Sequence, residues 1–278
     1  MKRAVKYLTL VDLIFVFVLA LSGSVGGALG QVVYFLAFGI PLFVGVYLSR
    51  ELKREREQVA GVAEPDFLRF GIGRRELGLF IPIIAPTVAL IMLAAWLTAL
   101  VLNSLGLTGG TIADAPFLLQ LLLHALIPAV LEEMLFRYLP IKLLLPYSPR
   151  GTVIISALFF ALIHLDLYKM PYAFLAGVVF AVLDIACDSI LPSLIIHLLN
   201  NAASLATMKY GVIDGFLTAF YVSLAALTVI SLAVIILRRR EYVTAAKRAT
   251  ERGRVEYDRT MLLMLVTCLG VALINALL

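Results

Sequence analysis

The side chains with the clearest chemical potential are two adjacent glutamates and an arginine inside a long apolar stretch, Glu132, Glu133 and Arg137. On a helix, Glu133 and Arg137 lie four residues apart and can form an ion pair on one face. Glu132 is displaced by about 100° and is not tied to the same arginine. A desolvated carboxylate in that position could act as a general base. The alternative is a charged cluster that snorkels at a helix end, which is favoured for any single Glu–Arg pair.

The chain has three histidines, and all of them fall in apolar stretches. His164 follows Phe160 by four residues, so the two rings can pack together on a helix. His197 and Asn201 are also one turn apart and direct two hydrogen-bonding groups toward one place. Each pair alone is more typical of a hydrogen bond between membrane helices. Together with a carboxylate base, they are the parts needed to activate water and stabilise an oxyanion in amide hydrolysis.

Three more ionisable residues lie in apolar stretches, where such groups are costly and each is a functional candidate. His124 precedes Glu132 by two turns on roughly the same face, so it is expected to line a polar cavity toward the outer leaflet. Asp12 and Asp184 are interpreted as hydrogen-bonding partners of neighbouring helices.

The composition requires a membrane environment for these residues. Of the 278 residues, 62% are hydrophobic and 15% are charged, whereas a soluble domain is nearer half apolar and a quarter charged. A soluble globular enzyme, a disordered protein and a disulfide-stapled secreted module are therefore excluded. Each membrane helix needs roughly 20 apolar residues. We predict an all-α polytopic bundle of eight or nine transmembrane helices that forms a single integral-membrane domain over residues 1–278.

Nine apolar stretches are predicted to span the membrane, and their limits can be read from the sequence. They are 8–22, 31–48, 79–105, 116–136, 151–165, 171–187, 190–208, 214–237 and 261–278. A cleavable signal peptide is the alternative for the first stretch. Asp12 interrupts its apolar core, which favours a retained span.

Lysine and arginine gather on one side of this predicted topology. The four basic segments are 2–6, 50–75, 137–150 and 238–259. They hold 21 of the 23 basic residues and leave only Lys169 and Lys209 for the other side. The positive-inside rule then predicts a cytoplasmic N-terminus and a C-terminus outside. The basic segments are expected to contact anionic lipid headgroups, so the net charge of +5 does not indicate nucleic-acid binding.

Three motifs occur in a fixed order on successive predicted helices: Glu132-Glu133-x-x-x-Arg137, Phe160-x-x-x-His164 and His197-x-x-x-Asn201. In this order they resemble the motifs of the CAAX prenyl endopeptidases and bacteriocin-processing enzymes, the CPBP or Abi family of intramembrane proteases. The resemblance covers about residues 79–208, which we take as the catalytic helix core. It implies an endopeptidase that cleaves a membrane-embedded or prenylated, CAAX-type peptide near its C-terminus.

The resemblance also implies a role for each matching position. Glu132 would activate the attacking water, and His164 would help to bind or polarise that water. His197 and Asn201 would form the oxyanion hole. The supporting residues would be Glu133, Arg137 and Phe160.

The sequence leaves metal use open. Glu132, His164 and His197 could ligate Zn²⁺. A glutamate-dependent enzyme without metal is favoured, because His197 and Asn201 together can act as a pair of hydrogen-bond donors. The sequence motifs of other intramembrane protease classes do not match this chain. A zinc protease of the H-E-x-x-H type is excluded because no histidine is followed by glutamate. A serine protease of the G-x-S-x-G type is not supported, because the nearest match, residues 22–26, has serine at its first position. An aspartyl protease is not supported, because Asp184 lacks the preceding G-x-G.

The expected depth of the site follows from the helix ends. If Arg137 marks a cytoplasmic helix end, Glu132 lies about 7–8 Å inside it, so the site is expected to open toward the cytoplasmic leaflet. Counted from Gly151, His164 lies deeper, at about 20 Å. Two rival functions remain open. One is a transporter that uses the charged cluster as a proton relay, although no internal repeat supports it, and the other is a non-proteolytic immunity or interaction protein.

Overall fold

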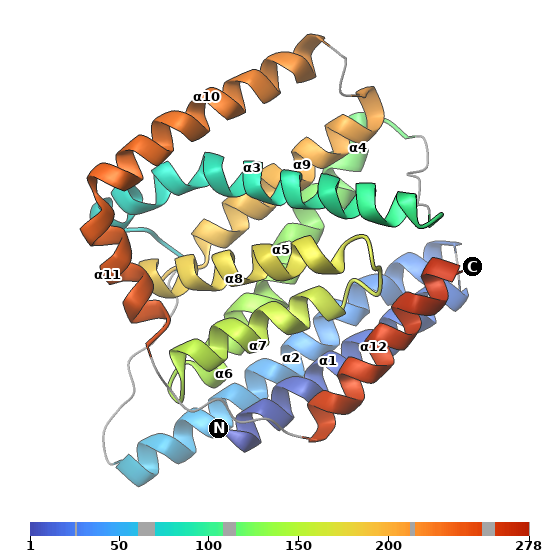
Figure 1. Ribbon diagram of the computed structural model, residues 1–278. Helices are drawn as coiled ribbons and strands as arrows, with labels where there is room; N and C mark the ends of the chain where they lie inside the picture. Colours follow the sequence, from blue (N-terminus) through green and yellow to red (C-terminus); the bar gives the residue numbers. More distant parts are fainter. Residues whose placement is uncertain (26, 61–69, 108–114, 212–214, 252–258, 278) are drawn as a thin grey trace.

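The computed structural model describes residues 1–25, 27–60, 70–107, 115–211, 215–251 and 259–277. Every regular element in these ranges is a helix (Figure 1), which confirms the predicted all-α bundle. The long helices are α1 (Lys2–Val25), α2 (Gly27–Ala60), α3 (Arg74–Ser104), α8 (Met170–Cys187), α9 (Leu191–Tyr210), α10 (Gly215–Leu237) and α12 (Arg259–Leu277). The others are α4 (Phe117–Gln120), η1 (Leu121–Leu126), α5 (Ile127–Glu133), η2 (Met134–Tyr138), α6 (Leu139–Leu144), α7 (Pro149–Leu162) and α11 (Arg239–Ala249).

Seven helical segments within the described ranges are long and apolar enough to cross a membrane, so the chain is an integral multi-pass membrane protein. Five short elements, α4 to α6, join into one of these segments over 117–144. The two other expected spans are also helices, α7 and α9. At 14 residues α7 extends about 21 Å, which is shorter than a bilayer core of roughly 30 Å. Polar residues such as His197 and Asn200 lower the hydropathy of α9.

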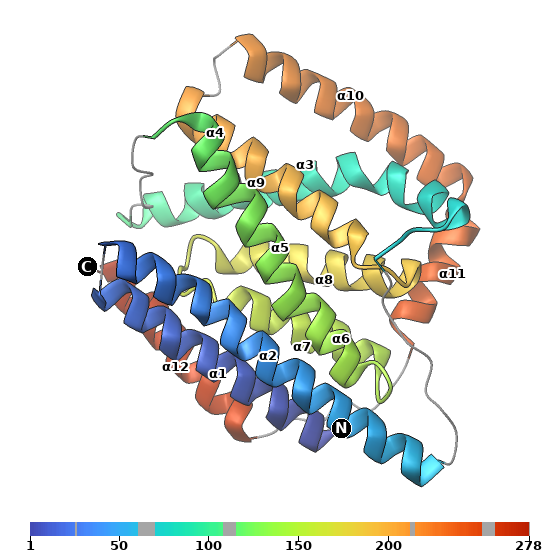
Figure 2. The ribbon, with the colours of Figure 1, turned by 180° about the vertical axis from the view of Figure 1, so that it is seen from behind.

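The helices form two flanks around a central group. α1, α2 and α12 lie side by side on one flank, and α3 and α10 pack together on the other (Figure 1). Seen from behind, the segment from α4 to α6 runs through the middle of the bundle near α9 (Figure 2). α7 and α8 pack against each other in the same central group. The three predicted motifs therefore lie on neighbouring central helices.

A proline shapes the helix that carries the two glutamates. Pro140 has no N–H, so the carbonyl of Phe136, four residues earlier, loses its α-helical donor. In η2, a π-helical turn, this carbonyl instead accepts hydrogen bonds from Ser156 Oγ at 2.6 Å and Arg137 Nη1 at 2.8 Å. The first of these bonds connects the segment to α7. π-Helical turns of this kind occur frequently at functional sites.

The helix does not end at Arg137. It continues through the π turn to Leu144, and the side chain of Arg137 is 0% exposed. The prediction that Arg137 marks a helix end is therefore wrong, as is the alternative of a snorkelling cluster. The physical reason is that Ser156 and Arg137 itself satisfy the carbonyl that Pro140 leaves free. Glu132 lies about 18 Å from the end at Leu144.

α7 and α8 approach each other closely at two small residues. A Cβ atom built on Gly177 would lie 2.8 Å from the Cα and 3.0 Å from the Cβ of Ala157. Small residues at such a contact are typical of packed membrane helices. The contact sets the position of α7, which carries His164 just after its end, relative to α8, which carries Phe180.

The two apolar-stretch aspartates behave differently. Asp184 on α8 accepts hydrogen bonds from the backbone N–H and the hydroxyl of Ser193 on α9, at 3.0 Å and 2.7 Å, so its expected role between helices is confirmed. Asp12 on α1 is buried, and neither carboxyl oxygen has a hydrogen-bond partner among the described residues. The prediction of a partner is wrong for Asp12, because α12 brings the apolar-buried thiol of Cys268 near it instead of a strong donor.

Candidate active site

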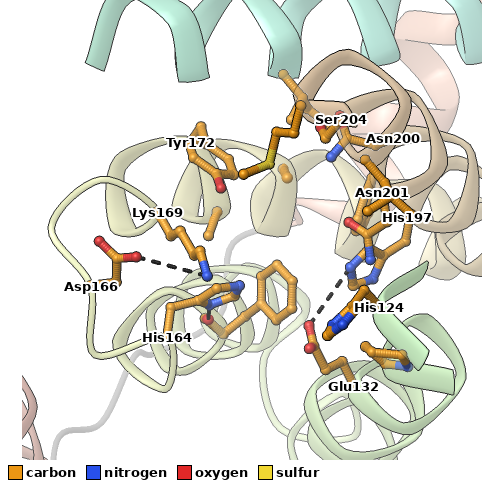
Figure 3. A pocket seen from close by; sticks show the side chains of 18 of the residues that line it. His124, Glu132, His164, Asp166, Lys169, Tyr172, His197, Asn200, Asn201 and Ser204 are labelled. Carbon is orange, nitrogen blue, oxygen red and sulfur yellow. Dashed lines mark hydrogen bonds and ion pairs between the residues drawn. The ribbon is translucent and has the colours of Figure 1, made fainter. Parts of the chain in front are cut away.

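A cavity of about 420 Å³ lies among the central helices (Figure 3). The four residues predicted to be catalytic line it: Glu132, His164, His197 and Asn201. They come from α5, the turn after α7, and α9. His124, on η1, lines the same cavity, as its position relative to Glu132 predicts.

Two carboxylates flank the imidazole of His197. Its Nδ1 lies 2.7 Å from Glu133 Oε1, and its Nε2 lies 3.7 Å from Glu132 Oε2. The expected ion pair within α5 and η2 is also present, with Arg137 Nε 3.6 Å from Glu133 Oε2. Glu133 therefore connects Arg137 to His197. This second contact crosses between two helices and was not expected from the sequence.

Hydrogen-bond chemistry assigns the protons of His197. A carboxylate only accepts hydrogen bonds, so Nδ1 of His197 donates to Glu133. Nε2 is then the nitrogen that faces Glu132 and the cavity. The buried cluster holds two carboxylates and one guanidinium. An imidazolium at His197 makes its net charge zero, which suits an environment where unpaired charge is costly.

The backbone orients His164. Its Nδ1 lies 2.7 Å from the carbonyl oxygen of Phe160, and because a carbonyl only accepts, Nδ1 carries the proton. The Nε2 of a neutral His164 ring therefore bears a lone pair. The expected contact between Phe160 and His164 is present, in an edge-to-face arrangement with ring centroids 5.0 Å apart. Phe160 also contacts His197, at a centroid distance of 5.6 Å.

Arg137 closes the buried end of the site. Its guanidinium lies 4.2 Å from the ring centroid of Phe160 and 5.6 Å from that of Phe180. The cation is thus held between two aromatic rings and Glu133, away from water. It supports the site through Glu133 and does not line the cavity.

Several cavity residues were not expected from the sequence. Asn200 is buried, and its Oδ1 has no hydrogen-bond partner within the described ranges. Figure 3 shows Asn201 beside His197, whereas Asn200 lies nearer Ser204. Tyr34 reaches the cavity from α2. Asn200 could have been found by its spacing of three from His197, but no sequence signal connects Tyr34 to the motifs.

The alternative zinc set can be compared with the arrangement of the side chains. Glu132, His164 and His197 all line the cavity. Within the part of the chain that the structure describes, however, no three His, Cys, Asp or Glu side chains form a group that could hold a metal ion. His164 is turned toward Phe160, and His197 is held by Glu133. As arranged, these residues do not fit a three-ligand zinc site.

The mouth of the cavity lies at one end of the bundle. Lys169, His124 and Met208 line it with exposed side chains, whereas Glu133 and Arg137, at the other end of the site, are buried. The mouth is therefore at the opposite end of the bundle from the start of α1 (Figure 1). The expectation that the site opens toward the cytoplasmic leaflet depended on a helix end at Arg137, and the structure has no helix end there.

Comparison with protein families relates the segment that carries the site to a known protease family. Residues 114–203 match the family model described as type II CAAX prenyl endopeptidase Rce1-like. This segment is Rce1-like. It contains all three motifs and matches the family that the resemblance of the motifs predicted. No curated protein and no solved structure matches the chain. The Rce1-like segment runs from the start of the 117–144 segment into α9, so both flanks, with α1, α2 and α12 on one and α3 and α10 on the other, lie outside it.

Proposed function

We propose that the chain is an intramembrane endopeptidase in which Glu132 activates the attacking water. The observation that carries the proposal is the position of Glu132. Its carboxylate lines the cavity, lies 3.7 Å from His197 and is not engaged by Arg137, which pairs with Glu133 instead. The adjacent carboxylates thus have separate tasks, one directed at the cavity and one at supporting groups.

The reaction that these residues support is amide hydrolysis. Glu132 takes a proton from water, and the water oxygen forms a bond to the carbonyl carbon of the peptide. His164 holds the same water by accepting its other proton in a hydrogen bond at Nε2. When the intermediate collapses, the carbon–nitrogen bond breaks, and Glu132 returns the proton to the leaving amine.

The developing negative charge needs donors on the other side of the carbonyl. His197 supplies Nε2–H when it is an imidazolium, and Asn201 supplies its side-chain amide. Glu133 is a positioning residue, because its hydrogen bond to Nδ1 fixes the ring that donates. The substrate is a membrane-embedded or prenylated peptide that reaches the cavity with its scissile bond extended.

A matched pair of glutamate variants tests this proposal. Cleavage of a panel of farnesylated, acylated and unmodified peptides is measured in detergent, where both ends of the protein are accessible. We expect Glu132→Gln to lower the rate by about 10²–10⁴-fold. Glu251→Gln, at an exposed glutamate after α11, should keep the wild-type rate. Equal rates for wild type and Glu132→Gln, or no cleavage of any peptide by wild type, would contradict the proposal.

A further inference from the structure

The residues behind the cavity are buried, whereas lining residues at its opposite end are exposed. The side chains of Glu133 and Arg137 are 1% and 0% exposed, and that of Glu132 is 14% exposed. At the opposite end, Lys169 and Met208 have exposed fractions of 52% and 57%. A substrate therefore enters past Lys169 and Met208 and reaches Glu132 last.

The helix ends that surround the mouth are tied together. α7 ends there, α8 begins there and α9 ends there. Tyr168 Oη, in the connection between α7 and α8, donates to the carbonyl of Leu107 after α3. Asn275, near the end of α12, donates through Nδ2 to the carbonyl of Leu165 at 3.0 Å. The mouth is thus formed at the end of the bundle where α3, α7 and α12 finish.

The basic residues lie at the other end of the same helices. α1 begins there with Lys2 and Arg3, α7 begins there beside Arg150, and α10 ends there at Arg238. α11, which carries Lys247 and further basic residues, packs against α7 and α8. Apart from the buried Arg137, the basic residues of these segments that the structure describes belong to this end. Among the described residues, the basic side chains at the mouth end are Lys169 and Lys209.

We infer that the active site takes its substrate from the extracytoplasmic side of the membrane. The inference rests on the proposed function, on the position of the mouth and on the rule that basic segments remain cytoplasmic. The substrate class is a peptide segment presented at the outer leaflet. A lipidated C-terminus held in the cytoplasm would meet the closed end of the site, where Arg137 and Glu133 are buried between helices.

The surface beside the mouth suits a substrate that is anchored in lipid. His124 lines the cavity and is itself exposed, and its neighbours Leu122 and Leu123 are exposed apolar residues on η1. The cavity therefore borders a face that lies against acyl chains. An apolar anchor can stay in the outer leaflet along η1 while the adjoining peptide enters the cavity.

Two lysine-to-cysteine variants test the side on which the mouth lies. Lys169→Cys places a thiol at the mouth, and Lys247→Cys places one on α11 at the basic end. The natural cysteines, Cys187 and Cys268, are buried, and the unsubstituted protein gives their background. Each variant is treated with a membrane-impermeant maleimide in sealed right-side-out vesicles, before and after permeabilisation.

We expect Lys169→Cys to label equally before and after permeabilisation. Lys247→Cys should label at least ten-fold more after it. The reverse pattern would overturn the inference, and so would equal labelling of both variants in vesicles whose sidedness a marker protein verifies.

An activity measurement separates this inference from the proposed function. Proteoliposomes sorted by orientation receive an impermeant, lipid-anchored peptide on the outside only. Cleavage is expected where the mouth end faces outward and should disappear in Glu132→Gln. Cleavage that depends on Glu132 but requires the basic end to face outward would overturn the inference and leave the proposed function standing. Cleavage that is independent of Glu132 would instead contradict the proposed function.

Discussion

At the scale of single residues, the two adjacent glutamates differ in their surroundings. Glu133 is held by both Arg137 and His197, whereas Glu132 faces the cavity. The same side-chain type thus has two tasks, because successive helical positions point in different directions. The sequence predicts this division, since only Glu133 is spaced to pair with Arg137.

The positioning role of Glu133 leads to a kinetic prediction. Glu133→Gln removes the carboxylate that accepts from Nδ1 of His197 and neutralises the charge beside Arg137. We expect kcat to fall by about 10–100-fold, as for other groups that orient a catalytic residue, with KM changed by less than about three-fold. The measurement is a full kinetic comparison with wild type in detergent. A rise in KM at unchanged kcat would show that Glu133 acts in substrate binding instead.

The two buried aspartates give a prediction about stability. Asp184→Leu leaves the N–H of Ser193 without its acceptor and removes the shorter of the two hydrogen bonds of the Ser193 hydroxyl, which keeps the carbonyl of Ile190, so we expect a loss of about 1–3 kcal/mol. Asp12→Leu removes a buried carboxyl group that has no hydrogen-bond partner among the described residues and should be neutral or stabilising. Thermal unfolding in detergent compares the two variants. A larger loss for Asp12→Leu than for Asp184→Leu would show that Asp12 has an important partner.

At the scale of helices, the site depends on how closely α7 and α8 pack. Phe160 on α7 contacts both His164 and His197, and Phe180 on α8 approaches Arg137 and His197. The aromatic surroundings of the buried cluster are therefore assembled from both helices. Their spacing is set where Gly177 meets Ala157.

A glycine pair tests this spacing. Gly177→Val forces its side chain against the backbone of Ala157, and we expect it to cost about 1–3 kcal/mol by overpacking and to lower cleavage. Gly39→Val, on α2, meets no atom within 4 Å and should leave stability and cleavage close to wild type. The two variants are compared by thermal unfolding and by peptide cleavage. Wild-type behaviour of Gly177→Val would mean that α7 and α8 can separate without disturbing the site.

The π-helical turn η2 shows why one expectation from the sequence failed. An arginine after an apolar stretch, followed soon by Pro140, is typical of a helix end. Here Ser156, twenty residues later in the chain, satisfies the carbonyl that the proline leaves free. A contact between distant residues thus overrides a local pattern, and Arg137 is buried instead of exposed.

At the scale of the whole molecule, composition was sufficient to predict the all-α membrane bundle, because 62% apolar content requires it. Spacing within each motif was sufficient to predict the pair Glu133–Arg137 and the contact of Phe160 with His164. Contacts between motifs were not predictable. The hydrogen bond between Glu133 and His197 joins residues 64 positions apart, and no periodicity in the sequence encodes such a distance.

The whole molecule also relates the chemistry to the membrane. Most of the described basic residues gather at one end of the bundle, and the cavity opens at the other. The sequence alone placed both on the same side, because it took Arg137 as a helix end. Because Arg137 is buried at the closed end of the site, the same charge distribution now indicates that the substrate enters from the extracytoplasmic side.

Hydrolysis in H₂¹⁸O tests most directly whether Glu132 activates water for peptide cleavage. A lipid-anchored peptide is incubated with wild type or with Glu132→Gln in detergent, and the masses of the products are measured by mass spectrometry. We predict that wild type gives a product with one ¹⁸O atom in its new carboxylate and that Glu132→Gln gives at most about 1% of that product. Labelled product at the wild-type rate from Glu132→Gln, or wild-type product without ¹⁸O, would contradict the proposed mechanism.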